Sequence, residues 1–229
     1  MKQLFEDVWI ADGDTVSFYT LPYTTRMTLV RLADGTLWVH SPIRLNAGLR
    51  RRVEALGEVR YLVAPNHLHH LYLQDWQRAY PDARLFGTRE VITKRGELAF
   101  DGRLDAGASY PWSDELRHLL FTGSRLMEEC VFLHVATRTL IVADLVENFA
   151  PRAFGPLQRG VARMTGILAP NGGMPRDWRL SFAFHKAEAR AHLRSLLAWR
   201  PETIVMAHGE IVDTDAQAFL RRSFGWLKP

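Results

Sequence analysis

Cysteine is almost missing from this chain of 229 residues, in which Cys130 is the only one. A single cysteine excludes an internal disulfide framework, and it also excludes a metal site built from thiolates alone. No run of about 18 apolar residues is present, so no segment is expected to span a bilayer. The stretch from Met1 to Asp7 carries acids where a signal peptide needs an apolar run. Together these absences favour a cytoplasmic protein without a membrane partner.

Motifs for nucleic-acid binding, phosphate binding and serine nucleophiles are missing as well. The chain has no zinc-finger spacing, no RNP-like motif, no phosphate loop and no Gly-x-Ser-x-Gly elbow. Its net charge is +4, and the basic residues are scattered, apart from three arginines at 50–52 and a looser group at 152–179. Three arginines in a row are typical of a solvated helix face. We therefore expect no nucleic-acid partner but a small-molecule substrate, for which an anionic group is one option. The oligomeric state is left open.

Apolar residues make up 47% of the chain and charged residues 24%, as in a globular protein with a full core. Apolar runs that alternate with amphipathic stretches predict strands at 59–64, 84–87, 130–135, 140–143 and 203–207, and helices at 45–56, 73–80, 186–199 and 215–224. Before them, Asp34-Gly35 predicts a hairpin turn. Residues 150–180, rich in Gly, Pro and Arg, are expected to form an insertion or lid, with a helix near 157–164. The predicted fold is an α/β fold with helices outside a sheet core, in one domain over residues 1–229.

Three of the predicted strands are followed closely by histidine or aspartate, residue types that commonly bind metals. The carboxyl ends of strands in α/β sheets meet where the loops gather, so we expect these side chains to lie together. Imidazoles and carboxylates are donors that Zn²⁺, Fe and Mn²⁺ accept. The alternatives are exposed turn histidines and a carboxylate that caps a turn through Asn148 or through backbone N–H groups. The candidate metal ligands are His67, His69, His70, Asp144 and His208.

This pattern resembles the metallo-β-lactamase superfamily. The superfamily's His-x-His-x-Asp-His loop is matched by the first three candidates, with His67 as its second histidine, His69 in place of the Asp, and His70 as its final histidine. Asp144 matches the superfamily's later strand-end Asp, and His208 matches its last histidine. The resemblance implies a four-layer αβ/βα sandwich and a metal-dependent hydrolase.

Three further stretches are similar to one branch of that superfamily, the DUF4336 family. They are Leu-Pro-Tyr-Thr-Thr-Arg-Met-Thr at 21–28, Leu-Trp-Val-His-Ser-Pro at 37–42 and Pro-Asn at 65–66. The resemblance covers most of the chain and is less clear over 150–179.

The chain departs from the superfamily at the first of its two metal sites. Pro65 stands where the first histidine belongs, and the stretch 123–129 lacks the histidine that the superfamily has there. The first site therefore keeps only His67 and a share of Asp144. The resemblance implies one tightly held divalent ion, zinc in the first place and iron or manganese as alternatives. It would be held by the second site, which keeps His69, His70, Asp144 and His208.

Two further residues are candidate supporting residues. Glu129, just before a buried strand, would substitute as a ligand or form a salt bridge with Arg125. His134, inside that strand, would orient a ligand carboxylate or would be a core histidine bonded to the backbone.

The leading hypothesis for function is hydrolysis, with Asp144 and His70 as the predicted catalytic residues. A divalent ion would lower the pKa of bound water towards ~7 and polarise a carbonyl or phosphoryl oxygen. Asp144 would also orient the water, and Arg176 or Arg179 from the lid would bind an anionic substrate group. Two alternatives stay open: a binding or scaffold domain whose catalytic centre has eroded, and oxidative chemistry at a mononuclear iron.

Overall fold

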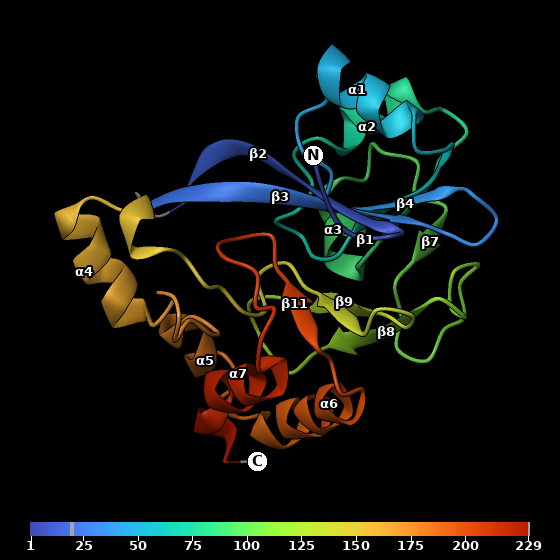
Figure 1. The fold of residues 1–229 in the computed structure, drawn as a ribbon. Helices are drawn as coiled ribbons and strands as arrows, with labels where there is room; N and C mark the ends of the chain where they lie inside the picture. The colour runs from blue at the N-terminus through green and yellow to red at the C-terminus, as the bar shows by residue number, and fades with distance from the viewer. Residues whose placement is uncertain (19–20, 229) are drawn as a thin grey trace. The chain divides into compact units, whose positions relative to one another are not determined.

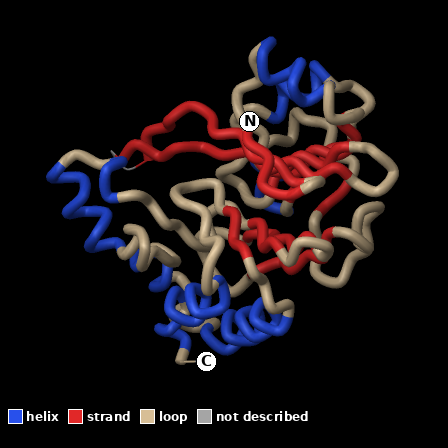
Figure 2. Tube along the Cα trace, in the orientation of Figure 1, coloured by secondary structure: helices blue, strands red, loops and turns tan. Residues whose placement is uncertain are grey.

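The computed structural model describes residues 1–18 and 21–228 (Figures 1 and 2). Contacts between residues divide the chain into two units. Unit 1 consists of Met1–Asp14 and Thr25–Trp112, and unit 2 consists of Thr15–Thr24 and Ser113–Pro229. Each unit has a hydrophobic core of its own.

Within the described residues, the first sheet has seven strands in the order β1-β2-β3-β4-β5-β6-β7. The pairs β1–β2 and β3–β4 are antiparallel, whereas β4, β5, β6 and β7 are parallel to one another. Gly35, with a φ of 80°, lies in the turn between β3 and β4, which confirms the predicted hairpin. The strands are β1 (Lys2–Phe5), β2 (Val8–Phe18), β3 (Leu21–Arg31), β4 (Leu37–His40), β5 (Val59–Ala64), β6 (Arg84–Gly87) and β7 (Gly102–Arg103).

Tryptophan side chains anchor the interior of unit 1. Trp38, Trp76 and Trp112 are fully buried, and Trp9 is 7% exposed. The indole N–H of Trp76 donates to the carbonyl oxygen of Ile43 at 2.7 Å, so this large ring is buried without loss of its hydrogen bond. The helices of the unit are α1 (Ala47–Glu54), α2 (Leu73–Ala79) and α3 (Arg89–Lys94).

The second sheet, in unit 2, has the order β11-β10-β9-β8. Its strands β8, β9 and β10 are antiparallel neighbours, but β10 and β11 are parallel. The carboxyl ends of β10 and β11 therefore lie at the same edge of the sheet. The strands are β8 (Leu116–Phe121), β9 (Glu129–His134), β10 (Thr139–Ile141) and β11 (Thr203–Val205).

Two amphipathic helices, α6 (Lys186–Ala198) and α7 (Ala216–Ser223), supply much of the core of unit 2. Both helices were predicted from the sequence, at 186–199 and 215–224, and the prediction is confirmed. The aromatic rings of Trp178, Trp199 and Trp226 are only partly buried against this core. None of the described helices combines the length and the hydropathy that a bilayer crossing requires.

The segment 150–180 contains the predicted helix, α4 (Pro156–Thr165), and a short second helix, α5 (Arg176–Leu180). It also has a single turn of 3-10 helix at Pro151–Ala153. Gly166 ends α4 in the left-handed conformation, with a φ of 78°, which a glycine adopts without strain. The inner side of α4 packs on a small apolar cluster of unit 2, made of Leu21, Tyr23, Phe149, Phe154, Ala162 and Ile167. The role of the segment as a lid stays a prediction.

Candidate functional site

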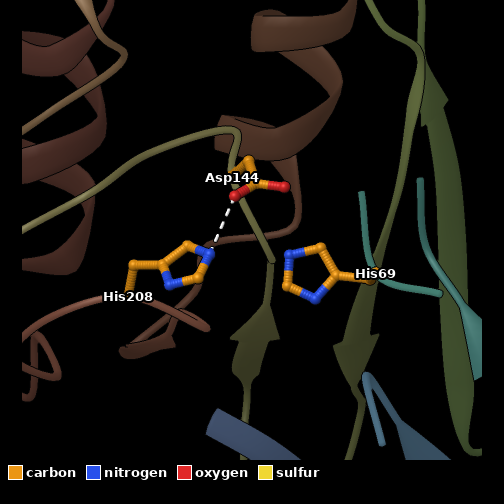
Figure 3. A group of neighbouring side chains, drawn as sticks. All are labelled: His69, Asp144 and His208. Carbon is orange, nitrogen blue, oxygen red and sulfur yellow. Dashed lines mark ion pairs between the residues drawn. The ribbon is translucent and has the colours of Figure 1, made fainter. Parts of the chain in front are cut away.

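Asp144 and His208 form a buried ion pair in unit 2. β10 and β11 are parallel, with Ile141 opposite Val205, and each of the two residues stands three positions beyond its strand. The two side chains therefore meet at one sheet edge, where His208 Nε2 lies 2.9 Å from Asp144 Oδ1 (Figure 3). Asp144 is only 4% exposed and His208 only 5%. A charged pair so far from water is costly unless its groups are fully bonded, which makes this edge of the sheet a candidate functional site.

Glu129 fixes the backbone from which Asp144 projects. Its Oε1 accepts the N–H of Ala143 at 2.8 Å, and its Oε2 accepts the N–H groups of Asp144 at 2.8 Å and Leu145 at 3.0 Å. The side chain is 2% exposed, so these bonds form away from water. Glu129 thus holds the turn that carries Asp144 through its backbone, a different role from the substitute ligand that the sequence suggested. The guanidinium of Arg125, the other suggested partner, lies over the ring of Phe184 at 5.1 Å.

His208 is oriented by a backbone carbonyl. Its Nδ1 donates to the carbonyl oxygen of Thr24 at 2.6 Å, so its Nε2 is the nitrogen turned towards Asp144. The ring of Tyr23 meets the imidazole edge-on, at 5.1 Å between centroids. Burial lowers the pKa of His208, but the hydrogen bond and charge of Asp144, together with Glu147, outweigh it and hold this pKa above its usual value. A carbonyl on the outer nitrogen is the arrangement that metal-binding histidines commonly have.

A second buried carboxyl group lies in the same unit. Glu147 is 3% exposed, and its Oε2 accepts the hydroxyl of Tyr23 at 3.0 Å. Burial raises the pKa of Glu147 to about 8, and the charge of Asp144 adds to the effect, while His208 opposes it. Burial and the nearby Glu147 also raise the pKa of the Tyr23 phenol. The sequence analysis missed Glu147, for which the available signal was an acid directly after the apolar pair Leu145-Val146.

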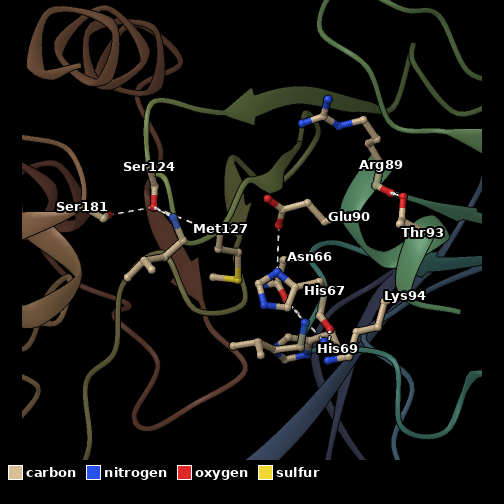
Figure 4. A network of polar contacts seen from close by, with 12 residues as sticks. Asn66, His67, His69, Arg89, Glu90, Thr93, Lys94, Ser124, Met127 and Ser181 are labelled. Carbon is tan, nitrogen blue, oxygen red and sulfur yellow. Dashed lines mark hydrogen bonds and ion pairs between the residues drawn. The ribbon is translucent and has the colours of Figure 1, made fainter. Parts of the chain in front are cut away.

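In unit 1, the loop after β5 presents three histidines. The Oδ1 of Asn66 accepts the N–H groups of Leu68 at 2.8 Å and His69 at 3.3 Å, which closes the loop into a tight turn. His67 Nδ1 lies 2.8 Å from Glu90 Oε2 on α3 (Figure 4). Lys94, one turn further along α3, donates to the carbonyl oxygen of His67 at 3.0 Å. Hydrogen bonds thus hold the loop both through its own backbone and through side chains of α3.

The other two imidazoles of this loop have partners of their own within unit 1. His69 Nδ1 is hydrogen-bonded to the hydroxyl of Ser41. Arg95 donates to the carbonyl oxygen of His70 at 2.8 Å and to its Nδ1 at 3.1 Å. Burial, with the charges of Lys94 and Arg95, lowers the pKa of His70 to about 4.

These hydrogen-bond partners determine which histidine nitrogens keep a lone pair for a metal ion. A neutral His70 that accepts from Arg95 at Nδ1 carries its proton on Nε2, so neither nitrogen offers a lone pair to an ion. His67, which donates from Nδ1 to the Glu90 carboxylate, keeps a lone pair on Nε2. The geometry therefore favours His67 over His70 as an electron-pair donor.

His134 lies far from the carboxylate that it was suggested to orient. It pairs in register with Thr139, at the start of β10, whereas Asp144 follows the other end of that strand. Its Nδ1 is 2.8 Å from the hydroxyl of Thr137. This position fits the alternative interpretation, a histidine of the core.

Comparison with known families and structures supplies the classification. A family model described as "Domain of unknown function (DUF4336)" matches residues 6–155. The chain belongs to the DUF4336 family. This assignment confirms the resemblance seen in the sequence. A search of curated proteins finds no match to this DUF4336 chain.

Solved structures similar to this DUF4336 chain include several metallo-β-lactamases. The DIM-1 metallo-β-lactamase exposed to ceftazidime has a TM-score of 0.68 at 11% identity, over 99% of this chain and 95% of that one. The metallo-β-lactamase from Pontibacter korlensis has a TM-score of 0.67 at 10% identity, over 99% and 97% of the two chains. The enzyme from Hirschia baltica has a TM-score of 0.66 at 13% identity, over 99% and 95%. These similarities confirm the predicted α/β class and show the metallo-β-lactamase fold.

Proposed function

We propose that this DUF4336 protein is a metal-dependent hydrolase in which Asp144 and His208 hold one divalent ion, with His69 as the expected third ligand. The observation that carries the proposal is the buried Asp144–His208 pair, whose two members follow adjacent parallel strands. The metallo-β-lactamase fold supports the same class of chemistry.

The donor set suits a divalent ion. Two imidazole nitrogens and a carboxylate oxygen are ligands that Zn²⁺ accepts, and three protein ligands leave a position open for a substrate or water. His208 needs only to lose the proton of Nε2, since its Nδ1 stays bound to the carbonyl of Thr24. Glu129 already holds the backbone N–H of Asp144, which fixes the turn that carries this carboxylate. Zinc is the proposed ion.

When bound, such an ion supplies Lewis-acid polarisation of a carbonyl or phosphoryl oxygen and a nucleophile of lowered pKa. The residues of the chain have separate tasks in this proposal. Asp144 orients the attacking water through a carboxylate oxygen. His67, kept in one tautomer by Glu90, takes up a proton at Nε2.

Metal titration of the purified protein tests the proposal. After treatment with a chelator, added Zn²⁺ should raise the free energy of unfolding with concentration, by about 2.7 kcal/mol at a hundredfold excess over Kd. Asp144→Asn and His208→Ala should each weaken Zn²⁺ binding on the order of tenfold to a hundredfold or more. His185→Gln is the matched control, because the His185 side chain is 48% exposed and pairs with Glu188, away from the candidate ligands. Absence of a concentration-dependent shift with Zn²⁺, Mn²⁺ and Fe²⁺ would contradict metal binding.

Two single variants separate the roles of the loop histidines. His69→Ala should lower the Zn²⁺ affinity, while His67→Ala should leave the affinity within about threefold and lower only the hydrolytic rate. Hydrolysis is measured on a panel of ester, lactone, amide and phosphodiester substrates.

One observation favours a second candidate function, a binding domain of the same fold. His70, which matches a ligand position of the superfamily, is held by Arg95 with its Nδ1 as the acceptor. A protein that binds Zn²⁺ tightly yet turns over none of the panel would support this alternative over the hydrolase.

A further inference from the structure

Helix α4 of unit 2 exposes a stripe of large apolar side chains. Leu157, Val161 and Met164 are 85%, 38% and 68% exposed. Their spacing of four and three residues puts them on one side of the helix. Ala162, on the inner side, is fully buried in the small apolar cluster beneath α4. The helix is therefore apolar on two faces, and the described residues of unit 2 cover only the inner one.

The surroundings of this stripe are basic. Residues 150–180 contain five arginines against one acid, Asp177, and no lysine or glutamate. Arg152 is 3.5 Å from Glu210 and is thereby partly neutralised. Arg176 and Arg179 both lie beside Gly166, at the end of α4. A Cβ atom added to Gly166 would be 3.4 Å from Arg176 Nε and 3.8 Å from Arg179 Nη2. Arg163 on α4 itself is exposed.

We propose that α4 docks this protein onto an anionic lipid bilayer, with Leu157, Val161 and Met164 inserted at the headgroup boundary and the neighbouring arginines against lipid phosphates. An amphipathic helix that lies in the interface needs an exposed apolar stripe and basic residues near it, and α4 has both. In Figure 1 the helix lies at the periphery of unit 2, with α5 beside its end.

The charges favour a bilayer over a second copy of the chain. Two copies joined through α4 would bring the arginines of both helices together, and like charges at an interface are destabilising. A bilayer with acidic headgroups attracts the same arginines, and its fluid surface accommodates a convex helix without a preformed groove. The expectation of no membrane partner came from the lack of a bilayer-spanning run. Binding in the plane of the interface requires no such run.

The test is flotation of the full chain with lipid vesicles. One set is made of phosphatidylcholine with about a third phosphatidylglycerol, and the other of phosphatidylcholine alone. The wild type should float with the anionic vesicles, and added salt should weaken its binding, because surface charges are screened. Leu157→Ser/Met164→Ser should lower the partition coefficient on the order of tenfold or more. Arg163→Gln/Arg176→Gln should lower it by a similar factor on anionic vesicles.

Two control variants carry the same types of substitution, Leu to Ser and Arg to Gln, at positions in unit 1. Leu71→Ser removes an apolar side chain that is 55% exposed in unit 1. Arg51→Gln removes one of the three arginines of α1. Both should bind anionic vesicles as the wild type does. Far-UV circular dichroism of every variant should match the wild type, since all the replaced side chains are at the surface.

Three results would overturn the proposal. The first is a wild type that stays unbound with both vesicle sets. The second is equal binding by the wild type and the Leu157→Ser/Met164→Ser variant. The third is a dimer, seen by analytical ultracentrifugation, that the same double substitution dissociates, because a second copy would then cover the stripe.

Discussion

Replacing Glu129 with glutamine turns one oxygen of a buried carboxylate into an NH₂ group and removes the charge. In the wild type the two oxygens accept three backbone N–H groups, from Ala143, Asp144 and Leu145. The oxygen of glutamine can take over the two N–H groups that share Oε2, but the NH₂ group then faces the N–H of Ala143. One unsatisfied buried N–H costs about 1–3 kcal/mol, and the other two bonds lose about 1 kcal/mol together because their acceptor is no longer ionised. We therefore expect the free energy of unfolding to fall by about 2–4 kcal/mol.

Urea unfolding at neutral pH, followed by far-UV circular dichroism, measures this loss. Glu202→Gln is the matched control in unit 2, because Glu202 is 66% exposed and its pair with Arg138 spans 3.3 Å at the surface. Loss of such a pair changes stability by about 1 kcal/mol or less. The Zn²⁺ affinity of Glu129→Gln should also fall, by about tenfold to a hundredfold, since Asp144 loses its support. If the free energy of unfolding of Glu129→Gln lies within about 0.5 kcal/mol of the wild-type value, the three hydrogen bonds do not hold the turn.

Three further substitutions test other parts of unit 2. Tyr23→Phe removes the hydroxyl that donates to the buried Glu147 carboxyl group, and urea unfolding should show a loss of about 1–3 kcal/mol; an unchanged midpoint would contradict the importance of this bond. Gly209→Ala should cost at least about 2 kcal/mol, because Gly209 has a φ of +98° and its Cβ would lie 2.4 Å from the backbone of Asn148; a stable, fully folded variant would show that the backbone there can shift. Burial lowers the pKa of His192, against the opposing charge of Glu188, so the wild type should lose stability as the pH falls below the unfolded value of about 6.5. His192→Gln should lose less between about pH 7 and pH 5, and parallel curves for the two proteins would refute this assignment.

The strands that lead to Asp144 and His208 could be predicted from the sequence, because a short apolar run is a local signal. That the two residues pair across β10 and β11 also followed, since both stand directly after such runs. The family was correctly inferred from stretches such as 21–28 and 37–42. Each of these predictions started from a signal carried by residues close together in the chain.

The partners of the site residues could not be predicted, because they depend on tertiary contacts. Glu129 reaches the backbone of Asp144 from the neighbouring strand β9, and Thr24 reaches His208 from a position 184 residues away. His70 was predicted to be a catalytic ligand from its place in a motif, but the motif does not reveal that Arg95 donates to its Nδ1. The participation of His69 in one ion with Asp144 and His208 stays a proposal.

The tryptophans differ between the two units in a way that matters for any unfolding study. Trp9, Trp38, Trp76 and Trp112 are buried in unit 1, whereas the three of unit 2 are only partly buried. The change in intrinsic fluorescence on unfolding therefore reports mainly on unit 1, while the helices α4, α6 and α7 give unit 2 the larger share of the helical circular dichroism signal. Two optical probes recorded on one sample can thus follow the two units separately, and transitions that do not coincide would reveal a species in which one unit has melted before the other.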